Sequence, residues 1–272
     1  MYSTELVVQT FISGIMIGVL YALMALGITF IYSIMRMINW AMGEFYMIGS
    51  YLQYMLVAFL LGPDLWWLAI PVSTAGIFAL GIAVQWGLLK PIFKKPPELR
   101  DDYATVVTLA LLLLFRSLAT GIAGPNQFTP GSNLPIVMVG PMPLAGARVA
   151  AFVFALAVLA IFWAVLRYTW YGLALRAASQ SRVGVQTAGI DVLGIDRMAF
   201  GIGAALAGLA GALLAPVFLV FPTNGMVTTV KGFEIVVIGG LGSIPGALIA
   251  GILLGLIESF GAAFLDSAYQ NI

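Results

Sequence analysis

The sequence predicts an all-α, polytopic membrane protein that forms one helical bundle. Of its 272 residues, 62% are hydrophobic and only 8% are charged, and the mean hydropathy is +1.07. A soluble fold has too little interior to bury this much apolar surface. The chain also contains about seven apolar runs close to the ~20 residues that a helix needs to cross a bilayer. We therefore expect residues 1–272 to form a single transmembrane domain.

The composition excludes several classes of function. A net charge of +1 argues against nucleic acid as a partner. The chain has no cysteine and no histidine, which removes disulfides, thiol nucleophiles, His–Cys metal sites and imidazole catalysis. We expect no cofactor and no metal site. The N-terminus lacks the basic region of a cleavable signal peptide, so the first apolar run is expected to remain as a span.

The chain before the polar segment at residues 170–197 is predicted to contain five spans. Leu6–Met35 is the first, and a short polar patch then leads into the apolar run Phe45–Leu61, which puts Glu44 near a membrane boundary. A turn at Gly62 starts the third span, which ends near residue 89. The fourth and fifth spans are expected at residues 104–123 and 148–167. Arg116 lies inside the fourth, where it either extends its side chain to the far membrane surface or takes part in a transport pathway.

The distribution of basic residues predicts which loops face the cytoplasm, because cytoplasmic loops are rich in lysine and arginine. Nine of the twelve basic residues lie in loops that we assign to the cytoplasm: Arg36, Lys90, Lys94, Lys95, Arg100, Arg167, Arg176, Arg182 and Arg197. Arg148 and Lys231 are assigned to the outside. The loop of residues 124–147 has five prolines and no charged residue, and we also expect it outside.

The segment Trp170–Arg197 is the one long polar interruption in this apolar chain. Ser179 or Ser181 can cap a helix start, and Gly189 suits the left-handed position that ends a helix, so a helix of about two turns is predicted. Such a helix on a cytoplasmic loop is a docking surface. The alternative is a simple connector at the membrane interface, but links between helices usually need only ~2–8 residues.

The remainder of the chain contains a sixth span, a broken segment and a final helix. Asp196 is expected to cap the sixth span, residues 199–221, whose many glycines and alanines indicate packing against protein. The following apolar run is too short to cross before Gly239, Gly240 and Gly242 interrupt it. Broken helices persist at membrane depth only beside protein or a water-filled cavity, so these glycines are candidate pathway residues.

Three carboxylates are further pathway candidates: Glu44, Glu234 and Glu258. Burying an unpaired carboxylate in a membrane is costly, although each could instead pair with a backbone donor or an arginine. A weak internal similarity relates Gly43-Glu44-Phe45 to Gly232-Phe233-Glu234. Transporters often contain such repeats, with the binding site between them.

Four motifs together resemble the H-type permease subunit of branched-chain amino-acid ABC importers. They begin at Gln9 (QTFISGIMIGVLYALMALGITFIY), Asn39 (NWAMGEFYMIGSY), Gly172 (GLALRAASQSRVGVQTAGIDV) and Ile238 (IGGLGSIPGALIAG), and they cover nearly the whole chain. The resemblance implies a bacterial inner-membrane importer with a second homologous permease, two cytoplasmic ATPases and a periplasmic solute-binding protein. It also implies that the central loop is the segment that couples to an ATPase, with these residues: Arg176, Ala177, Ala178, Ser181, Arg182 and Gly189.

Two features depart from the family pattern. Family members usually continue into a further hydrophobic segment, so an eighth span and a tail are expected beyond Ile272. The loop also carries Ser-Gln-Ser-Arg-Val-Gly where relatives often place acidic residues.

Three classes of function remain after this comparison. An ABC permease subunit is favoured, because the chain lacks the G-x-x-x-x-G-K-[ST] loop for ATP and so needs a partner that binds it. A proton- or ion-coupled secondary transporter or channel is the alternative, and it would depend on the three carboxylates. A membrane enzyme is disfavoured, because scattered carboxylates without histidine or cysteine form no recognisable catalytic set.

Overall fold

The computed structural model describes residues 4–131, 133–139 and 142–264. Within them the chain is almost entirely helical, and seven helical segments are long and apolar enough to cross a membrane, which confirms the predicted fold class. The elements before the hairpin are α1 (Thr4–Met35), α2 (Met42–Leu56), η1 (Val57–Leu61), η2 (Pro63–Leu65), α3 (Trp66–Val84), η3 (Gln85–Leu89), η4 (Lys90–Lys94) and α4 (Pro97–Ala123). The later elements are β1 (Val137–Val139), β2 (Met142–Leu144), α5 (Gly146–Tyr168), α6 (Trp170–Gln180), α7 (Arg182–Thr187), α8 (Val192–Leu214), α9 (Asn224–Gly239) and α10 (Ile244–Phe264).

The centre of the bundle is formed by α1 and α8. In their most apolar stretches, 89% of α1 and 78% of α8 are buried inside the protein, against 17% for α4 and for α5. Small residues allow this close packing: the Cα of Gly18 is so near Ile252 of α10 that an added Cβ would lie 2.7 Å from that residue's Cα. The α4 and α5 helices instead present large apolar side chains outward, as expected for surfaces that contact lipid or another membrane subunit.

The helices α1, α2 and α3 pack against α8, α9 and α10. The α1 helix packs along α10, α3 packs along α8, and α2 packs against α9. Both long pairs are antiparallel, because Gly14 lies beside Leu256 while Gly18 lies beside Ile252, and Ile77 lies beside Gly208 while Gly81 lies beside Gly201. This packing of α1–α2–α3 against α8–α9–α10 is the packing expected of an inverted repeat.

The two segments matched by the weak internal similarity lie at different places in this packing. Gly43 lies against Gly225, because an added Cβ on Gly43 would collide with the Gly225 carbonyl oxygen. Gly232, which the sequence similarity matched to Gly43, instead packs on Met24 and Ile28 of α1. Short Gly-rich apolar segments resemble one another by composition, so this similarity does not identify positions that pack alike.

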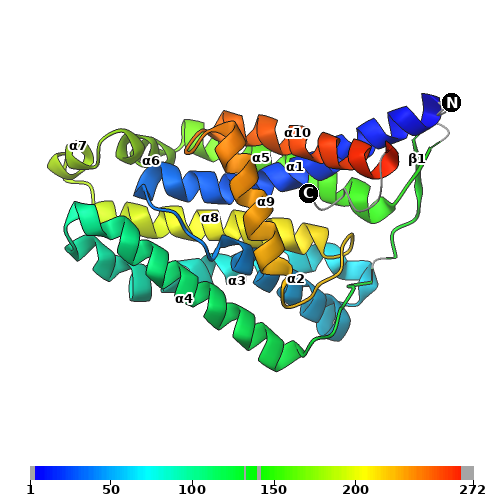
Figure 1. The fold of residues 1–272 in the computed structure, drawn as a ribbon, viewed down its shortest axis with the longest axis horizontal. Coiled ribbons are helices and arrows are strands. Elements are labelled where there is room, and N and C mark those ends of the chain that lie inside the picture. The colour runs from blue at the N-terminus through cyan, green and yellow to red at the C-terminus, as the bar shows by residue number, and fades with distance from the viewer. Residues whose placement is uncertain (1–3, 132, 140–141, 265–272) are drawn as a thin grey trace.

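The two ends of the bundle carry different segments (Figure 1). The α6 and α7 helices lie at one end with η4, where the guanidinium of Arg182 lies 4.9 Å from the centre of the Phe93 ring. The loop between α4 and α5 lies at the other end, where the Asn133 amide donates to Asp64 at 2.8 Å. The structure thus groups the loops as the charge distribution predicted. Which end faces the cytoplasm remains a prediction.

Two expectations about the second half of the chain are wrong. The sixth span is α8, which begins at Val192, about two turns before the predicted start. Its cap is Asp191, whose Oδ1 accepts a hydrogen bond from the backbone N of Leu193 at 3.0 Å. Asp196 lies inside the helix with a fully buried side chain. Both Asp191 and Asp196 fit the sequence pattern of a helix cap. Which of them caps α8 depends on the tertiary partner of Asp196, which is described below.

Candidate functional site

The polar interruption forms two helices where the sequence predicted one. The unpredicted helix is α6, which starts where Thr169 Oγ1 accepts from the backbone N of Gly172 at 3.1 Å. It buries one face, with Ala174, Leu175 and Ala178 packed inward, and it contacts α5 and α1. The apolar spacing of those three residues is typical of an amphipathic helix, so the signal was present in the sequence.

The α7 helix confirms the predicted short helix and both of its ends. Ser181 Oγ accepts from the backbone N of Gly184 at 3.0 Å, and Gly189 has a left-handed φ of 78°. Val185 is buried beneath the helix, whereas Val183 is 71% exposed. Figure 1 shows α7 at the extreme end of the molecule, beyond the spans. The α7 helix therefore exposes a small surface on one side, and its other side is attached to the bundle.

Arg182 provides that attachment, in a position that the sequence did not predict. Its guanidinium forms two hydrogen bonds to Asp196 of α8, at 3.0 and 2.5 Å, and donates at 3.1 Å to the carbonyl of Ile34 at the end of α1. The Arg182 side chain is 27% exposed and that of Asp196 is fully buried. Arg182 thus faces inward and joins α7 to the two central helices, and does not lie open on the outer surface of the loop.

The other residues expected in the coupling segment divide between its two faces. Arg176 is exposed and donates to the carbonyls of Gly172 (3.3 Å) and Arg167 (3.5 Å). Ala177 is half-buried and Ala178 is buried, so Ala178 packs against the bundle. Arg36, just after α1, donates to the carbonyl of Ser179 at 3.2 Å.

A polar recess of about 560 Å³ connects this segment to the broken helix. Its lining includes Arg36, directly after α1, and Ser179 and Gln180 at the end of α6. It also includes Leu241, Gly242 and Ser243 from the turn between α9 and α10. The end of α6 and that turn therefore face a common space.

The broken segment itself is confirmed. The α9 helix ends at Gly239 and α10 begins at Ile244, and both Gly240 and Gly242 have left-handed φ values, 89° and 85°. Gly239 approaches Gly246 so closely that an added Cβ would lie 2.7 Å from the backbone N of Ala247. At Gly240 the nearest atom to an added Cβ is 3.8 Å away. A side chain at Gly239 would therefore clash with the neighbouring backbone. At Gly240 and Gly242 it is the positive φ that favours glycine.

Glu44 lies where α2 and α9 begin beside each other. It occupies the first turn of α2 and is fully buried, and an added Cβ on Gly225, in the first turn of α9, would lie 2.7 Å from its carboxyl carbon. The two helix starts are joined by a 3.1 Å hydrogen bond from the backbone N of Gly43 to Thr229 Oγ1. Among the described residues, neither oxygen of Glu44 has a hydrogen-bond partner. The positive ends of two helix dipoles thus face this carboxylate.

Glu258 belongs to a separate buried cluster. Its Oε1 lies 2.7 Å from the ammonium of Lys231, and its Oε2 accepts from the hydroxyl of Tyr21 at 2.9 Å. The assignment of Lys231 to an outer loop was wrong, because the residue lies in α9 with only 11% of its side chain exposed. A rule that counts basic residues by position cannot identify a lysine whose charge is balanced by a distant carboxylate inside the bundle.

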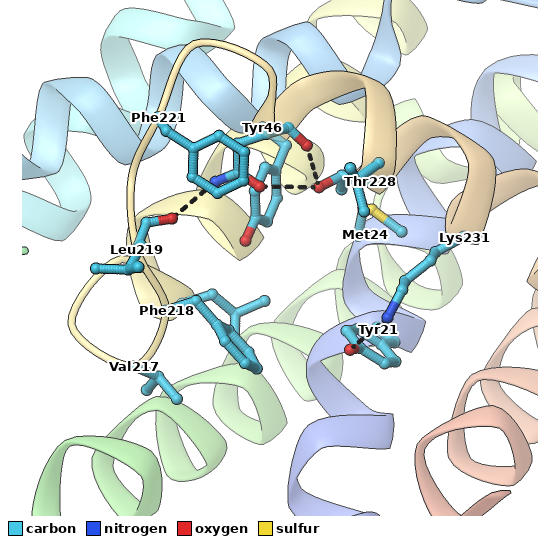
Figure 2. Close-up of a pocket in the computed structure, with 12 residues that line it drawn as sticks. Tyr21, Met24, Tyr46, Val217, Phe218, Leu219, Phe221, Thr228 and Lys231 are labelled. Carbon is cyan, nitrogen blue, oxygen red and sulfur yellow. Dashed lines mark hydrogen bonds between the residues drawn. The ribbon is translucent and has the colours of Figure 1, made fainter. Parts of the chain in front are cut away.

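A cavity of about 380 Å³ adjoins this ion pair. Tyr21 and Lys231 form part of its wall, Val217 and Phe218 form part of the rest, and Figure 2 shows these side chains around the space. Glu234, the third candidate carboxylate, is half-buried in α9. It lies nine residues after Gly225, or about 13 Å along the helix. The structure therefore does not bring the three carboxylates into one site.

Comparison with known proteins identifies the family. The model for the branched-chain amino acid transport system permease component matches residues 10–272. The permease protein LivH of Salmonella typhimurium is 32% identical over 277 residues, covering 97% of this chain and 89% of that protein. BraD of Pseudomonas aeruginosa is 29% identical over 282 residues, with the same coverage. A probable LivH of Methanocaldococcus jannaschii is 30% identical over 260 residues, covering 92% of this chain and 79% of that protein.

No solved structure matches the chain. The family match spans the first helix, both halves of the inverted repeat, the α6–α7 segment and the broken helix. With its seven apolar helices, this chain belongs to the branched-chain amino acid transport permease family and is a multi-pass permease subunit of an ABC importer.

Proposed function

We propose that this chain carries branched-chain amino acids from the periplasm to the cytoplasm across a bacterial inner membrane. In this proposal it works with a second homologous permease and a periplasmic binding protein, and two cytoplasmic ATPases hydrolyse the ATP. The names of the similar proteins, LivH and BraD, refer to high-affinity branched-chain amino acid transport, which supports this class of cargo.

The observation that carries the proposal is the α7 helix and its attachment. Gln186 and Thr187 of α7, and Ala188 directly after it, are exposed at the end of the bundle, where a cytoplasmic subunit can reach them. Arg182 connects the same helix to α8 through Asp196 and to α1 through the carbonyl of Ile34. A force on α7 is therefore passed to the two central helices. A connector at the membrane interface needs no such link.

The cargo pathway is proposed to involve Glu44, Glu258 and the turn at Gly239, Gly240 and Gly242. The recess shared by Ser179 and Gly242 supports a link between α6 and this turn. Movement of the coupling segment can thus alter the position of α9 relative to α10. Glu234 is kept as a pathway candidate because it lies on α9, which ends at the same turn.

The test uses Gly189, where the backbone conformation can be perturbed without a steric clash. No atom lies within 4 Å of an added Cβ at this position, so any effect comes from its φ of 78°. We expect Gly189→Val to distort the end of α7, because a branched residue is strained there. Gly189→Asn is the matched control, because asparagine tolerates the left-handed region.

Both variants are expected to reach the membrane at wild-type levels. Gly189→Val should lose both the co-purifying ATPase and ATP-driven leucine uptake, whereas Gly189→Asn should keep both. Ala188→Pro should behave like Gly189→Val, because it removes the 3.1 Å hydrogen bond from the Ala188 backbone N to the Gly184 carbonyl. Full uptake and normal ATPase binding by Gly189→Val and Ala188→Pro would show that α7 is not the coupling surface.

One observation favours a second candidate, a proton-coupled transporter. The buried carboxylate of Glu44, which has no hydrogen-bond partner among the described residues, is the kind of group that carries protons in membrane proteins. Under this alternative, Glu44→Gln abolishes uptake and a protonophore stops wild-type uptake while ATP is still present. Under the ABC proposal, the protonophore has no direct effect on uptake by the reconstituted complex.

A further inference from the structure

We propose that the ion pair of Lys231 and Glu258 binds the zwitterionic head group of the amino-acid cargo, and that the adjoining cavity receives its aliphatic side chain. This inference rests on the proposed function, because it assumes that the cargo is an amino acid. It adds a defined binding site and assigns a role to each charge.

The two charges of the pair match the two charges of an α-amino acid. The Lys231 ammonium lies 2.7 Å from Glu258 Oε1 and 3.3 Å from the Tyr21 hydroxyl, which itself donates to Glu258 Oε2. A cargo carboxylate can take the place of Glu258 at the lysine, while the cargo ammonium pairs with Glu258. Because a positive and a negative charge enter together, the net charge of the buried site does not change. The large cost of bringing a single charge into the bundle is thereby avoided.

The cavity beside the pair provides the apolar part of the site. Its volume of about 380 Å³ is within the range of small-molecule sites. Lys231 and Tyr21 lie at one edge, while Val217 and Phe218 lie across the space from Lys231 (Figure 2). Leu214 and Val227 add further aliphatic wall. Tyr46, Asn224 and Thr228 add polar groups to the lining, and apart from the charged edge its other residues are apolar. A charged edge beside a mainly apolar wall is the pattern expected for a ligand with a zwitterionic head and an aliphatic side chain.

The cavity also lies under a segment connected to the end of the bundle opposite α7. The connection between α8 and α9 supplies Val217, Phe218, Leu219 and Phe221 to its lining. This connection is held to the loop after α4 by paired backbone hydrogen bonds between Phe128 and Val220, at 2.8 and 2.9 Å. By the proposed topology this is the side from which cargo arrives. An ion pair that only fastened α9 to α10 would require no cavity beside it.

The first experiment separates a binding role from a fastening role. The double variant Lys231→Met/Glu258→Leu removes both charges of the pair together, and such replacements are often neutral for stability. In the complex reconstituted with its partner subunits and binding protein, we expect this double variant to keep its ATPase and its unfolding midpoint. Its leucine uptake should fall by more than about tenfold. Uptake near the wild-type rate would show that the pair is only structural.

The second experiment uses the folded protein with a single reporter and does not depend on removing the pair. The chain has no cysteine, so Val217→Cys places one thiol in the cavity wall. We expect leucine to slow thiol labelling of this variant in the complex by about threefold or more at saturation. Isocaproate, which lacks the ammonium, and isoamylamine, which lacks the carboxylate, should protect much less. Equal protection by all three compounds, or by none, would overturn the proposed recognition.

The two proposals fail in different ways. If the wild-type complex takes up no branched-chain amino acid, the proposed function is wrong. If the wild-type complex takes up leucine and the double variant does so equally well, only the assignment of Lys231 and Glu258 is wrong.

Discussion

The connection between α7 and the central helices predicts a large effect from a single substitution, Arg182→Met. This change removes the only cation that Asp196 contacts among the described residues and leaves its fully buried carboxylate unpaired. Removing one partner of a buried ion pair typically costs about 3–5 kcal/mol. The variant also loses the hydrogen bond to the Ile34 carbonyl and the contact with the Phe93 ring. We therefore expect a loss of stability near 4 kcal/mol, within that approximate range.

The double variant Arg182→Met/Asp196→Leu provides the control. It removes both charges, so most of the lost stability should return. Equilibrium unfolding in mixed detergent micelles gives the free energy for wild type, single and double variants. We expect the folded double variant to bind ATPase and hydrolyse ATP without uptake, because α7 no longer contacts α8 and α1 through this pair. A single variant that loses less than about 1 kcal/mol, or a double variant that remains as unstable as the single, would refute the reasoning.

Three further predictions concern topology, helix packing and the broken helix. An impermeant thiol reagent added outside whole cells should label Gln127→Cys but not Gln186→Cys, since both residues are exposed and belong to the loop after α4 and to α7, which lie at opposite ends of the bundle; labelling of Gln186→Cys alone would show that the topology is the reverse. Gly49→Ala should destabilise the protein by about 1–3 kcal/mol or more, because its Cβ would lie 2.7 Å from the Cα of Gly208, whereas Gly87→Ala, with no atom within 4 Å, should unfold like wild type. Gly240→Leu should insert but lose uptake, because the backbone of Gly240 (φ 89°, ψ 124°) is in a region that glycine alone occupies readily, and another residue is strained there by about 1–3 kcal/mol; uptake at the wild-type rate would exclude a backbone effect.

Features with a local cause could be predicted from the sequence. The seven spans follow from apolar length alone. The α7 helix follows from a serine cap and a glycine that supports positive φ, and Ser181 and Gly189 have these roles. The interruption after Gly239 follows from clustered glycines ahead of a proline. Each of these signals lies within a few residues of the feature that it produces.

Features with a distant cause could not be predicted in the same way. Asp196 and Lys231 look like a helix cap and a loop lysine until Arg182 and Glu258 are placed beside them. The pairs are separated by 14 and 27 residues, and only the packing of α7 on α8 and of α9 on α10 brings them together. The buried position of Glu44 has the same origin, because α9 covers it from the far end of the chain.

The inverted repeat shows a related limit. The sequence similarity matched Gly43 with Gly232, whereas in the structure Gly43 contacts Gly225 and Gly232 packs on α1. The α6 helix is a different case, because its apolar spacing was present and was hidden by the high polarity of the whole segment.

The central claim is that ATP hydrolysis by a partner seated on α7 drives amino-acid uptake through this permease. Its most direct test measures radiolabelled leucine uptake into proteoliposomes that contain this chain, the second permease and the ATPases, with binding protein outside. We predict that uptake requires ATP on the side that α7 faces, persists with a protonophore and disappears in the Ala188→Pro complex. Leucine uptake by this chain alone, driven by a pH gradient without ATP or ATPase, would contradict the account.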